Sequence, residues 1–197
     1  TLSSGAALEI VSGEMNINAQ DEWNGSITLT SGALNYANIT SNGLLFAENG
    51  TLTIQSGVLN IASTSYIKDT VSLIINETGT LSINGGEVDF NTGDTWTGKV
   101  TLDSGVMTYN NLASNGKFEA TGGTLNLNTG VLTLAKDTTV SRNDFIETGV
   151  VATIAEDAQV VLTGGSLELN TGDTWTGKVV GQSGNLNVNS LEIKVPK

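Results

Sequence analysis

The chain contains no cysteine and no histidine among its 197 residues. Without cysteine there is no disulfide framework, no thiolate ligand for a metal and no cysteine nucleophile. Without histidine the commonest general base, the Ser-His-Asp arrangement and the usual zinc ligand are all missing. These two absences remove most of the familiar routes to hydrolytic and metal chemistry.

Basic residues are also scarce: 8 lysines and arginines stand against 20 acids, which gives a net charge of −12. An acidic surface repels phosphate backbones and anionic lipids, so nucleic acid and membrane surfaces are not expected as partners. No apolar run approaches the roughly 18 residues that mark a membrane-spanning helix, and we expect no membrane insertion in this segment. Thr1 is not a natural start, so we expect the segment to belong to a longer protein.

Proline occurs once and aromatic residues make up 5%, whereas glycine occurs 24 times and threonine and asparagine are abundant. No window combines helix-forming residues with apolar residues spaced about 3.6 positions apart, so long helices are not expected. Many β-branched residues with little proline favour strands joined by tight glycine and asparagine turns.

One pattern recurs along the chain: Gly-x-Φ-x-Φ-x-[Ser/Gly]-Gly-x-Φ-Asn-Φ, in which Φ is apolar. It reads GTLTIQSGVLNI from Gly50 and GKVTLDSGVMTY from Gly98. Two-residue alternation directs Ile27 and Leu29 to one face and Thr28 to the other. Two short strands with a glycine corner between them cannot bury their apolar face alone, whereas stacked copies can.

The sequence therefore predicts an all-β fold, a parallel β-solenoid: a right-handed, three-sided β-helix with about ten coils of about 18–20 residues. A single solenoid segment is expected over residues 1–197, with Ile39, Leu112 and the tryptophans as apolar residues of the third side. The corner glycines are expected to adopt positive φ where the chain bends. These glycines are Gly13, Gly32, Gly57, Gly86, Gly105, Gly123, Gly165 and Gly184.

A longer repeat lies above the short one. Residues 43–61 match residues 116–134 at an offset of 73, and the segment NTGDTWTGKV recurs unchanged at an offset of 79. The three tryptophans, Trp23, Trp96 and Trp175, occupy equivalent positions. We expect superrepeats at approximately 5–77, 78–156 and, in part, 157–197, with the six extra residues of the second inside 136–148.

Asparagine recurs at one outward position of the repeat. Stacked amides hydrogen-bond to one another along a solenoid axis, so these residues are expected to form a structural ladder. Its members are Asn16, Asn35, Asn60, Asn126 and Asn187.

Two segments, residues 62–70 and 136–147, break the rhythm at equivalent places and are expected to be loop excursions. Insertions into a solenoid coil map to loops on one face and often carry binding. Tyr66, Lys68, Arg142 and Phe145 are the predicted binding residues, because they concentrate the unusual side chains of the chain in these two segments.

The carboxylates of the chain offer two kinds of chemistry, metal binding and catalysis. Asp94 and Asp173 lie in equivalent loops, but one aspartate per loop is too few for calcium, which takes six to eight oxygens. Glycoside chemistry needs clustered acids, and here the outward acids are scattered over several coils. We therefore expect no catalytic residues, no metal, no cofactor and no enzyme.

The SGxLN units and the segment GGTLNLNTG resemble the passenger repeats of bacterial autotransporter-type surface adhesins, which are right-handed β-helices. The resemblance covers nearly the whole chain and implies an extracellular or cell-surface location, with adhesion or self-association by side-by-side contact of rods. The matching residues are those that form the fold, so no functional residue is carried over.

The leading hypothesis is a structural or adhesive repeat module of a secreted or cell-surface protein. Its partners would be further copies of the rod, or a glycan or protein on a host or cell surface. The alternative is a carbohydrate-binding or carbohydrate-cleaving β-helix of the tail-fibre or polysaccharide-lyase type, for which a cleft lined by aromatic residues and paired acids would be decisive.

Overall fold

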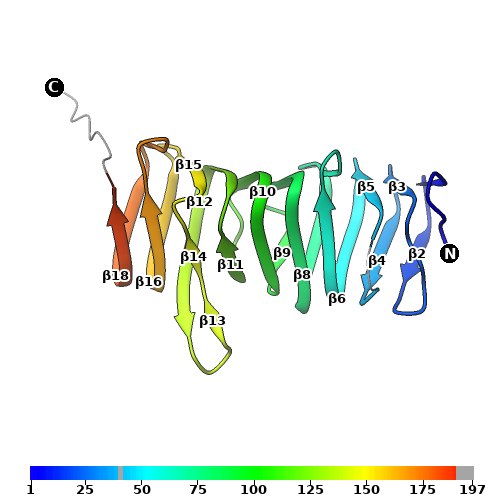
Figure 1. Ribbon diagram of the computed structural model, residues 1–197, viewed down its shortest axis with the longest axis horizontal. Helices are drawn as coiled ribbons and strands as arrows, with labels where there is room; N and C mark the ends of the chain where they lie inside the picture. Colours follow the sequence, from blue (N-terminus) through cyan, green and yellow to red (C-terminus); the bar gives the residue numbers. More distant parts are fainter. Residues whose placement is uncertain (40–41, 190–197) are drawn as a thin grey trace.

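The computed structural model describes residues 1–39 and 42–189, and in these residues the chain forms a rod of stacked strands without a helix (Figure 1). The prediction of an all-β parallel solenoid is confirmed, with about 9 turns in place of about ten. At about 4.8 Å per turn such a rod is roughly 43 Å long.

The strands vary from two to twenty residues because several of them continue around a corner of the solenoid. In chain order they are β1 (Ala7–Ile10), β2 (Glu14–Ile17), β3 (Ser26–Leu29), β4 (Ala33–Ala37), β5 (Leu44–Ala47), β6 (Gly50–Ala62), β7 (Tyr66–Ile67), β8 (Val71–Phe90), β9 (Thr95–Trp96), β10 (Lys99–Asn110), β11 (Lys117–Ala120), β12 (Gly123–Asp137), β13 (Arg142–Asn143), β14 (Phe145–Ile146), β15 (Val150–Ile154), β16 (Ala158–Leu169), β17 (Thr174–Trp175) and β18 (Lys178–Val188).

Parallel pairing divides these strands among three sides. Side A stacks β1, β3, β5, β7, the C-terminal parts of β8 and β10, the N-terminal part of β12, β15 and β17. Side B stacks β2, β4, the N-terminal parts of β6 and β8, and β9. It continues later with the C-terminal part of β12 and the N-terminal parts of β16 and β18. Side C stacks the C-terminal part of β6, the middle of β8, the start of β10, β11, β14 and the ends of β16 and β18.

The interior is filled by the residues that alternation predicts. Ile27 and Leu29 are fully buried and Thr28 between them is only half-buried. Two buried tyrosines add polar contacts between turns: the hydroxyl of Tyr36 donates to the carbonyl oxygen of Val58 at 2.6 Å, and that of Tyr109 donates to the carbonyl of Val131 at 2.7 Å. Burial raises the pKa of both phenols to about 12.

The corner glycines differ from expectation in one respect. Positive φ is found as predicted at Gly13, Gly32, Gly57, Gly105, Gly123 and Gly184. At the two Gly-Gly corners the prediction is wrong by one residue, because Gly85 and Gly164 take the positive φ instead of Gly86 and Gly165. The second glycine of each pair serves close stacking instead, since a Cβ on Gly86 would lie 2.6 Å from the carbonyl oxygen of Ser65 in the turn below.

The three equivalent tryptophans lie on three different sides. Trp175 pairs with Ile154 on side A, Trp96 pairs with Ile75 on side B, and Trp23 lies between β2 of side B and β3 of side A, hence on side C. Each superrepeat therefore spans three full turns and two further sides, which is one side short of four turns. A residue in one superrepeat and its equivalent in the next thus lie on different sides of the rod.

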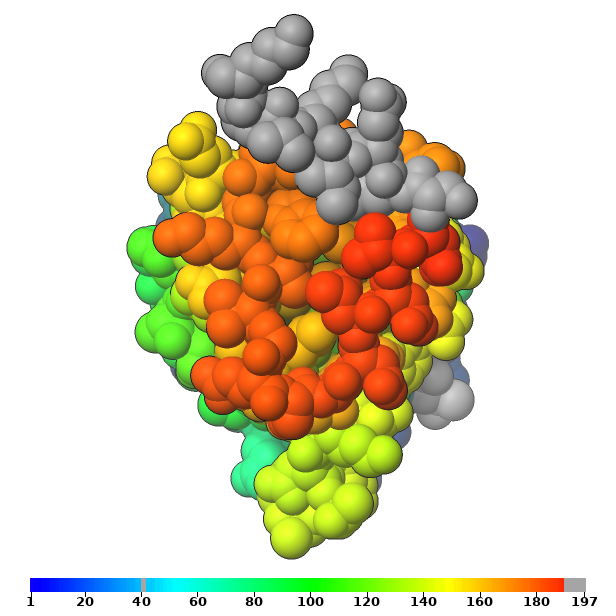
Figure 2. Space-filling model, turned by 90° about the vertical axis from the view of Figure 1, so that its left-hand side faces the viewer, coloured from blue at the N-terminus to red at the C-terminus, as the bar shows by residue number. Residues whose placement is uncertain are grey.

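One hairpin protrudes from the rod. After β12 the chain reverses and returns as β13, with Lys136 opposite Asn143 and Asp137 opposite Arg142 in an antiparallel pair. The hairpin projects from the corner between sides B and C; it lies below the rod in Figure 1 and extends beyond the cross-section of the rod in Figure 2. The expected excursion at residues 62–70 is wrong: that segment consists of two tight turns with β7 between them, and Tyr66 is already back in register on side A.

Candidate binding sites

Most aromatic side chains of the described residues fill the core, but three lie on the outer surface. Phe46, Tyr66 and Phe145 are half-buried, and each alternates with buried neighbours on its strand. Phe46 and Tyr66 are on side A, whereas Phe145 is on side C. Phe46 and Tyr66 form part of a first candidate site, whereas Phe145 pairs with Glu119 near a second candidate site but does not line its groove.

The first site is an aromatic platform on side A, made of Phe46, Glu48, Tyr66 and Lys68. The rings of Phe46 and Tyr66 lie 5.4 Å apart between centroids, with planes tilted by 49°. The Tyr66 hydroxyl donates to Oε1 of Glu48 at 2.8 Å, and Lys68 Nζ lies 3.4 Å from the same oxygen and 5.2 Å from the Tyr66 ring centroid. The Tyr66–Glu48 hydrogen bond is the main cause that raises the pKa of Tyr66 and lowers the pKa of Glu48.

At the second site, Arg142 fastens the hairpin to the rod. Its Nε donates to Oδ2 of Asp144 at 2.7 Å, and its NH2 donates to the carbonyl oxygen of Gly116 at 2.8 Å. Asp144 is fully buried and also accepts from the backbone N–H groups of Phe118 at 3.1 Å and Ala135 at 2.9 Å. The carboxylate thus joins three elements, and the guanidinium balances its charge.

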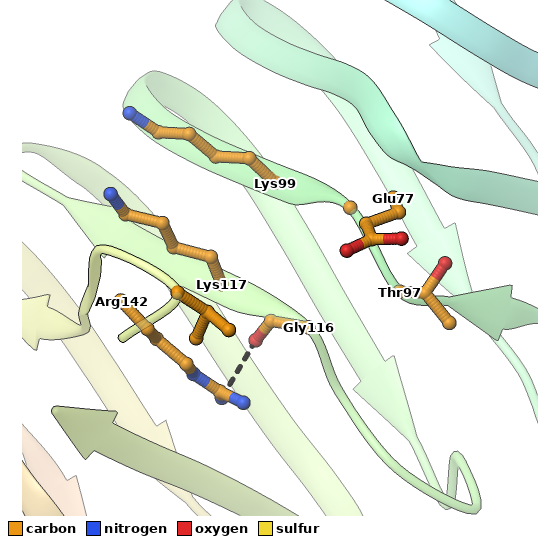
Figure 3. A pocket seen from close by; sticks show the side chains of 8 residues that line it. Glu77, Thr97, Lys99, Gly116, Lys117 and Arg142 are labelled. Carbon is orange, nitrogen blue, oxygen red and sulfur yellow. Dashed lines mark hydrogen bonds between the residues drawn. The ribbon is translucent and has the colours of Figure 1, made fainter. Parts of the chain in front are cut away.

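A groove of about 520 Å³ runs beside this anchor, and we call it the hairpin groove (Figure 3). The hairpin forms one edge and the corner between sides B and C forms the bottom, where glycines leave the backbone bare. Its lining residues are Glu77, Thr97, Gly98, Lys99, Gly116, Lys117, Val140 and Arg142.

Two lysines in adjacent strands define the basic edge of the groove. Lys99 of β10 and Lys117 of β11 are register partners and extend in the same direction in Figure 3. Both bind Glu119, at 2.5 Å from Lys99 and 2.9 Å from Lys117. Burial alone would raise the pKa of Glu119, but the bonds from the two lysines outweigh it and the pKa is lowered. Lys117 Nζ also donates to the carbonyl oxygen of Ser141 at 3.1 Å, in the hairpin.

The four predicted binding residues do not come together. Tyr66 and Lys68 lie in the aromatic platform on side A, while Arg142 and Phe145 lie on side C several turns away. Sequence reasoning missed Phe46, Lys99 and Lys117. The sequence did hold a signal for them: each lies at an outward position of the two-residue alternation, and Lys99 and Lys117 are one coil apart, as are Phe46 and Tyr66.

The predicted asparagine ladder is distributed over three sides. Asn16 and Asn35 are stacked as expected, with Nδ2 of Asn35 donating to Oδ1 of Asn16 at 2.9 Å. Asn60 instead pairs in register with Ser82 on side C, Asn126 with Thr153 on side A, and Asn187 with Glu168 on side C. A single ladder of all five does not form, because successive copies of the short repeat occupy different pairs of sides, and Asn35 and Asn60 already lie on different sides within the first superrepeat.

Two other asparagines connect turns through their side chains. Asn42 Nδ2 donates to the carbonyl oxygen of Asn60 at 2.7 Å, and its Oδ1 accepts from the Asn60 N–H at 2.8 Å. Asn115, 73 residues later in the sequence, makes the same pair of bonds to Thr133, both at 2.8 Å. In each case the side-chain amide supplies the donor and the acceptor that the backbone of a neighbouring strand would otherwise offer.

The aspartates of the NTGD loops are occupied by backbone donors. Asp94 accepts from the N–H groups of Leu73 at 2.8 Å and Asn91 at 2.9 Å, and Asp173 makes the equivalent bonds to Ala152 and Asn170. Burial raises the pKa of Asp94 to about 6. These contacts give the loops a structural role. Among residues 1–39 and 42–189, no three acidic side chains gather as metal ligands would.

No protein-family model matches the sequence, and no curated protein is significantly similar to it. Among solved structures, a crystal structure of a TibA fragment, hyper-glycosylated by TibC, aligns over 93% of this chain and 99% of that chain, with 16% identity and a TM-score of 0.21. At so low a TM-score the fold assignment rests on the strand pairing itself. No helix of the described part of the chain is long and apolar enough to cross a membrane.

Proposed function

We propose that the chain is a structural and adhesive module of an extracellular or cell-surface protein, in which a rigid rod presents binding surfaces. The continuous core carries this proposal: apolar side chains from about 9 turns form one column that holds the outer side chains at fixed spacing. A flat or flexible display would not keep neighbouring contacts in register. The resemblance to autotransporter passenger repeats supports the same reading.

Adhesion would work through many weak contacts. A rod with outward polar side chains at a repeat of about 4.8 Å can bind a second rod, or a glycan or protein on another surface, and the individual contacts add through effective concentration. The net charge of −12 keeps such rods apart unless their contacts are specific.

Sedimentation of the purified chain over a concentration series, with and without calcium, tests self-association. We expect reversible dimerisation, and we expect substitutions of outward side chains, such as Asn35→Ala, to weaken it. Substitutions at the end strands, for example Leu186→Ser in β18, serve as the control for end-to-end stacking of open strand edges. A monomer at every concentration, with or without calcium, rules out self-association for this segment.

The aromatic platform favours carbohydrate binding as a second candidate. Phe46 and Tyr66 offer adjoining ring surface beside the charged groups of Glu48 and Lys68, the combination that a sugar uses for stacking and hydrogen bonding. A glycan array probed with the chain and with Tyr66→Ala tests this candidate. Binding that Tyr66→Ala abolishes supports it, and an empty array contradicts it.

A further inference from the structure

We infer that the hairpin groove binds a carboxylated sugar, such as a hexuronic acid unit of a surface polysaccharide. The inference rests on the proposed adhesive function and adds to it a chemical class of ligand. It concerns residues of side C and the hairpin, and is independent of the aromatic platform on side A.

The groove has the size and shape for one or two sugar units. Its volume of about 520 Å³ falls within the range of small-molecule sites, about 300–1,000 Å³. Gly98 and Gly116 leave its bottom open, and neither position admits a side chain: a Cβ would lie 2.2 Å from a carbonyl oxygen of the turn below in both cases. The exposed side chain of Val140 offers an apolar surface for the C–H face of a sugar ring.

Positive charge gathers here on a chain that is otherwise acidic. Lys99, Lys117 and Arg142 are three of the 8 basic residues in a chain of net charge −12. Arg142 is balanced by Asp144 at 2.6 Å, but Lys99 and Lys117 share the single carboxylate of Glu119. The lysine pair therefore retains charge and hydrogen-bond donors for one more carboxylate.

The other end of the groove is acidic and distinguishes a sugar from a simple anion. Glu77 and Thr97 lie opposite the lysines in Figure 3 and provide hydrogen-bond acceptors for hydroxyl groups. A phosphate or an acidic peptide would gain nothing from Glu77 and would be repelled by it. A molecule with a carboxylate at one end and hydroxyls at the other satisfies both ends.

Calorimetric titration of the full chain at low salt tests the inference with two probes, a glucuronate-containing disaccharide and the matched neutral glucose disaccharide. We expect the acidic disaccharide to bind at least about tenfold more tightly, and the difference to shrink as salt is added. Lys99→Gln should weaken binding of the acidic probe about tenfold. Lys99 is the residue of choice because its loss leaves Glu119 paired with Lys117 and the hairpin contact of Lys117 intact.

Lys178→Gln is the matched control, because Lys178 is exposed on side B and does not line the groove. This variant should bind the acidic disaccharide as tightly as the wild type does. Val140→Ser, at an exposed position, should weaken binding without lowering the unfolding temperature. Equal binding of the two disaccharides, no binding, or no effect of Lys99→Gln would each overturn the inference, as would tighter binding of inorganic phosphate or of a glutamate peptide. Sedimentation tests the adhesive rod separately, so the two can fail independently.

Discussion

Replacing Arg142 by leucine should lower the free energy of unfolding by about 3 kcal/mol, because it strands a buried carboxylate. Asp144 has no exposed surface, and Arg142 holds it through Nε at 2.7 Å and NH2 at 2.6 Å. Removing one partner of a buried ion pair costs about 3–5 kcal/mol. Asp144 keeps two backbone N–H donors, from Phe118 and Ala135, which places the expected cost at the lower end of that range.

Urea unfolding followed by far-UV circular dichroism measures this loss. With an m-value of about 2–3 kcal/mol per M for a chain of this size, the midpoint should fall by about 1 M. Arg142→Lys keeps the charge but not the planar fork, so it should recover only part of the loss. Lys68→Leu is the control, since the Lys68–Glu48 pair is exposed and screened by solvent, so its loss should hardly move the midpoint. A midpoint for Arg142→Leu no lower than that of the control would refute the buried-charge argument.

Three further perturbations test the interior and the corners. Burial raises the pKa of Asp94 from 3.8 to about 6, so the folded chain binds this proton more tightly than the unfolded chain does. The stability that results is fully present below pH 3.8 and is lost as the pH rises through 6. The unfolding free energy of the wild type minus that of Asp94→Asn should therefore fall by about 1–2 kcal/mol between those limits, after allowance for solvent screening in this surface loop. A difference that stays flat with pH contradicts this. Tyr109→Phe removes the 2.7 Å hydrogen bond to the Val131 carbonyl and should cost about 1–2 kcal/mol in thermal or urea unfolding; an unchanged midpoint would show that the bond is not stabilising. Gly43→Ala should cost more than about 3 kcal/mol, because its Cβ would lie 1.9 Å from a carbonyl oxygen of the preceding turn, whereas Gly172→Ala, with no atom within 4 Å of its Cβ, should be tolerated.

The fold was predictable because the same local rule operates in every turn. Alternation places Ile27 and Leu29 inward, and glycine corners end each strand, so a pattern a dozen residues long contains the stacking of the whole rod. The Gly-Gly corners show the limit of such a rule. Either glycine can adopt positive φ, and which one does so depends on the close approach of the turn below, which acts through space.

The candidate sites were only partly predictable, because they depend on coil length. One turn takes 18 residues from Lys99 to Lys117 but 26 from Glu119 to Phe145, where the hairpin is inserted. An average period cannot align residues across such a change, so the basic edge of the groove was missed. Arg142 is the lone arginine of the sequence and was predicted as a binding residue, but its chief contact, the buried carboxylate of Asp144, follows from how the hairpin packs on the rod.

The shift of one side per superrepeat determines which features of the rod a partner can contact from one direction. Trp23, Trp96 and Trp175 show that a feature carried once per superrepeat faces three directions about 120° apart. Two such features return to the same direction only after eleven turns, about 53 Å along the axis. Eleven turns exceed the about 9 turns of this rod, so a feature carried once per superrepeat occurs at most once on each face, and a partner approaching from one direction meets a single copy of it.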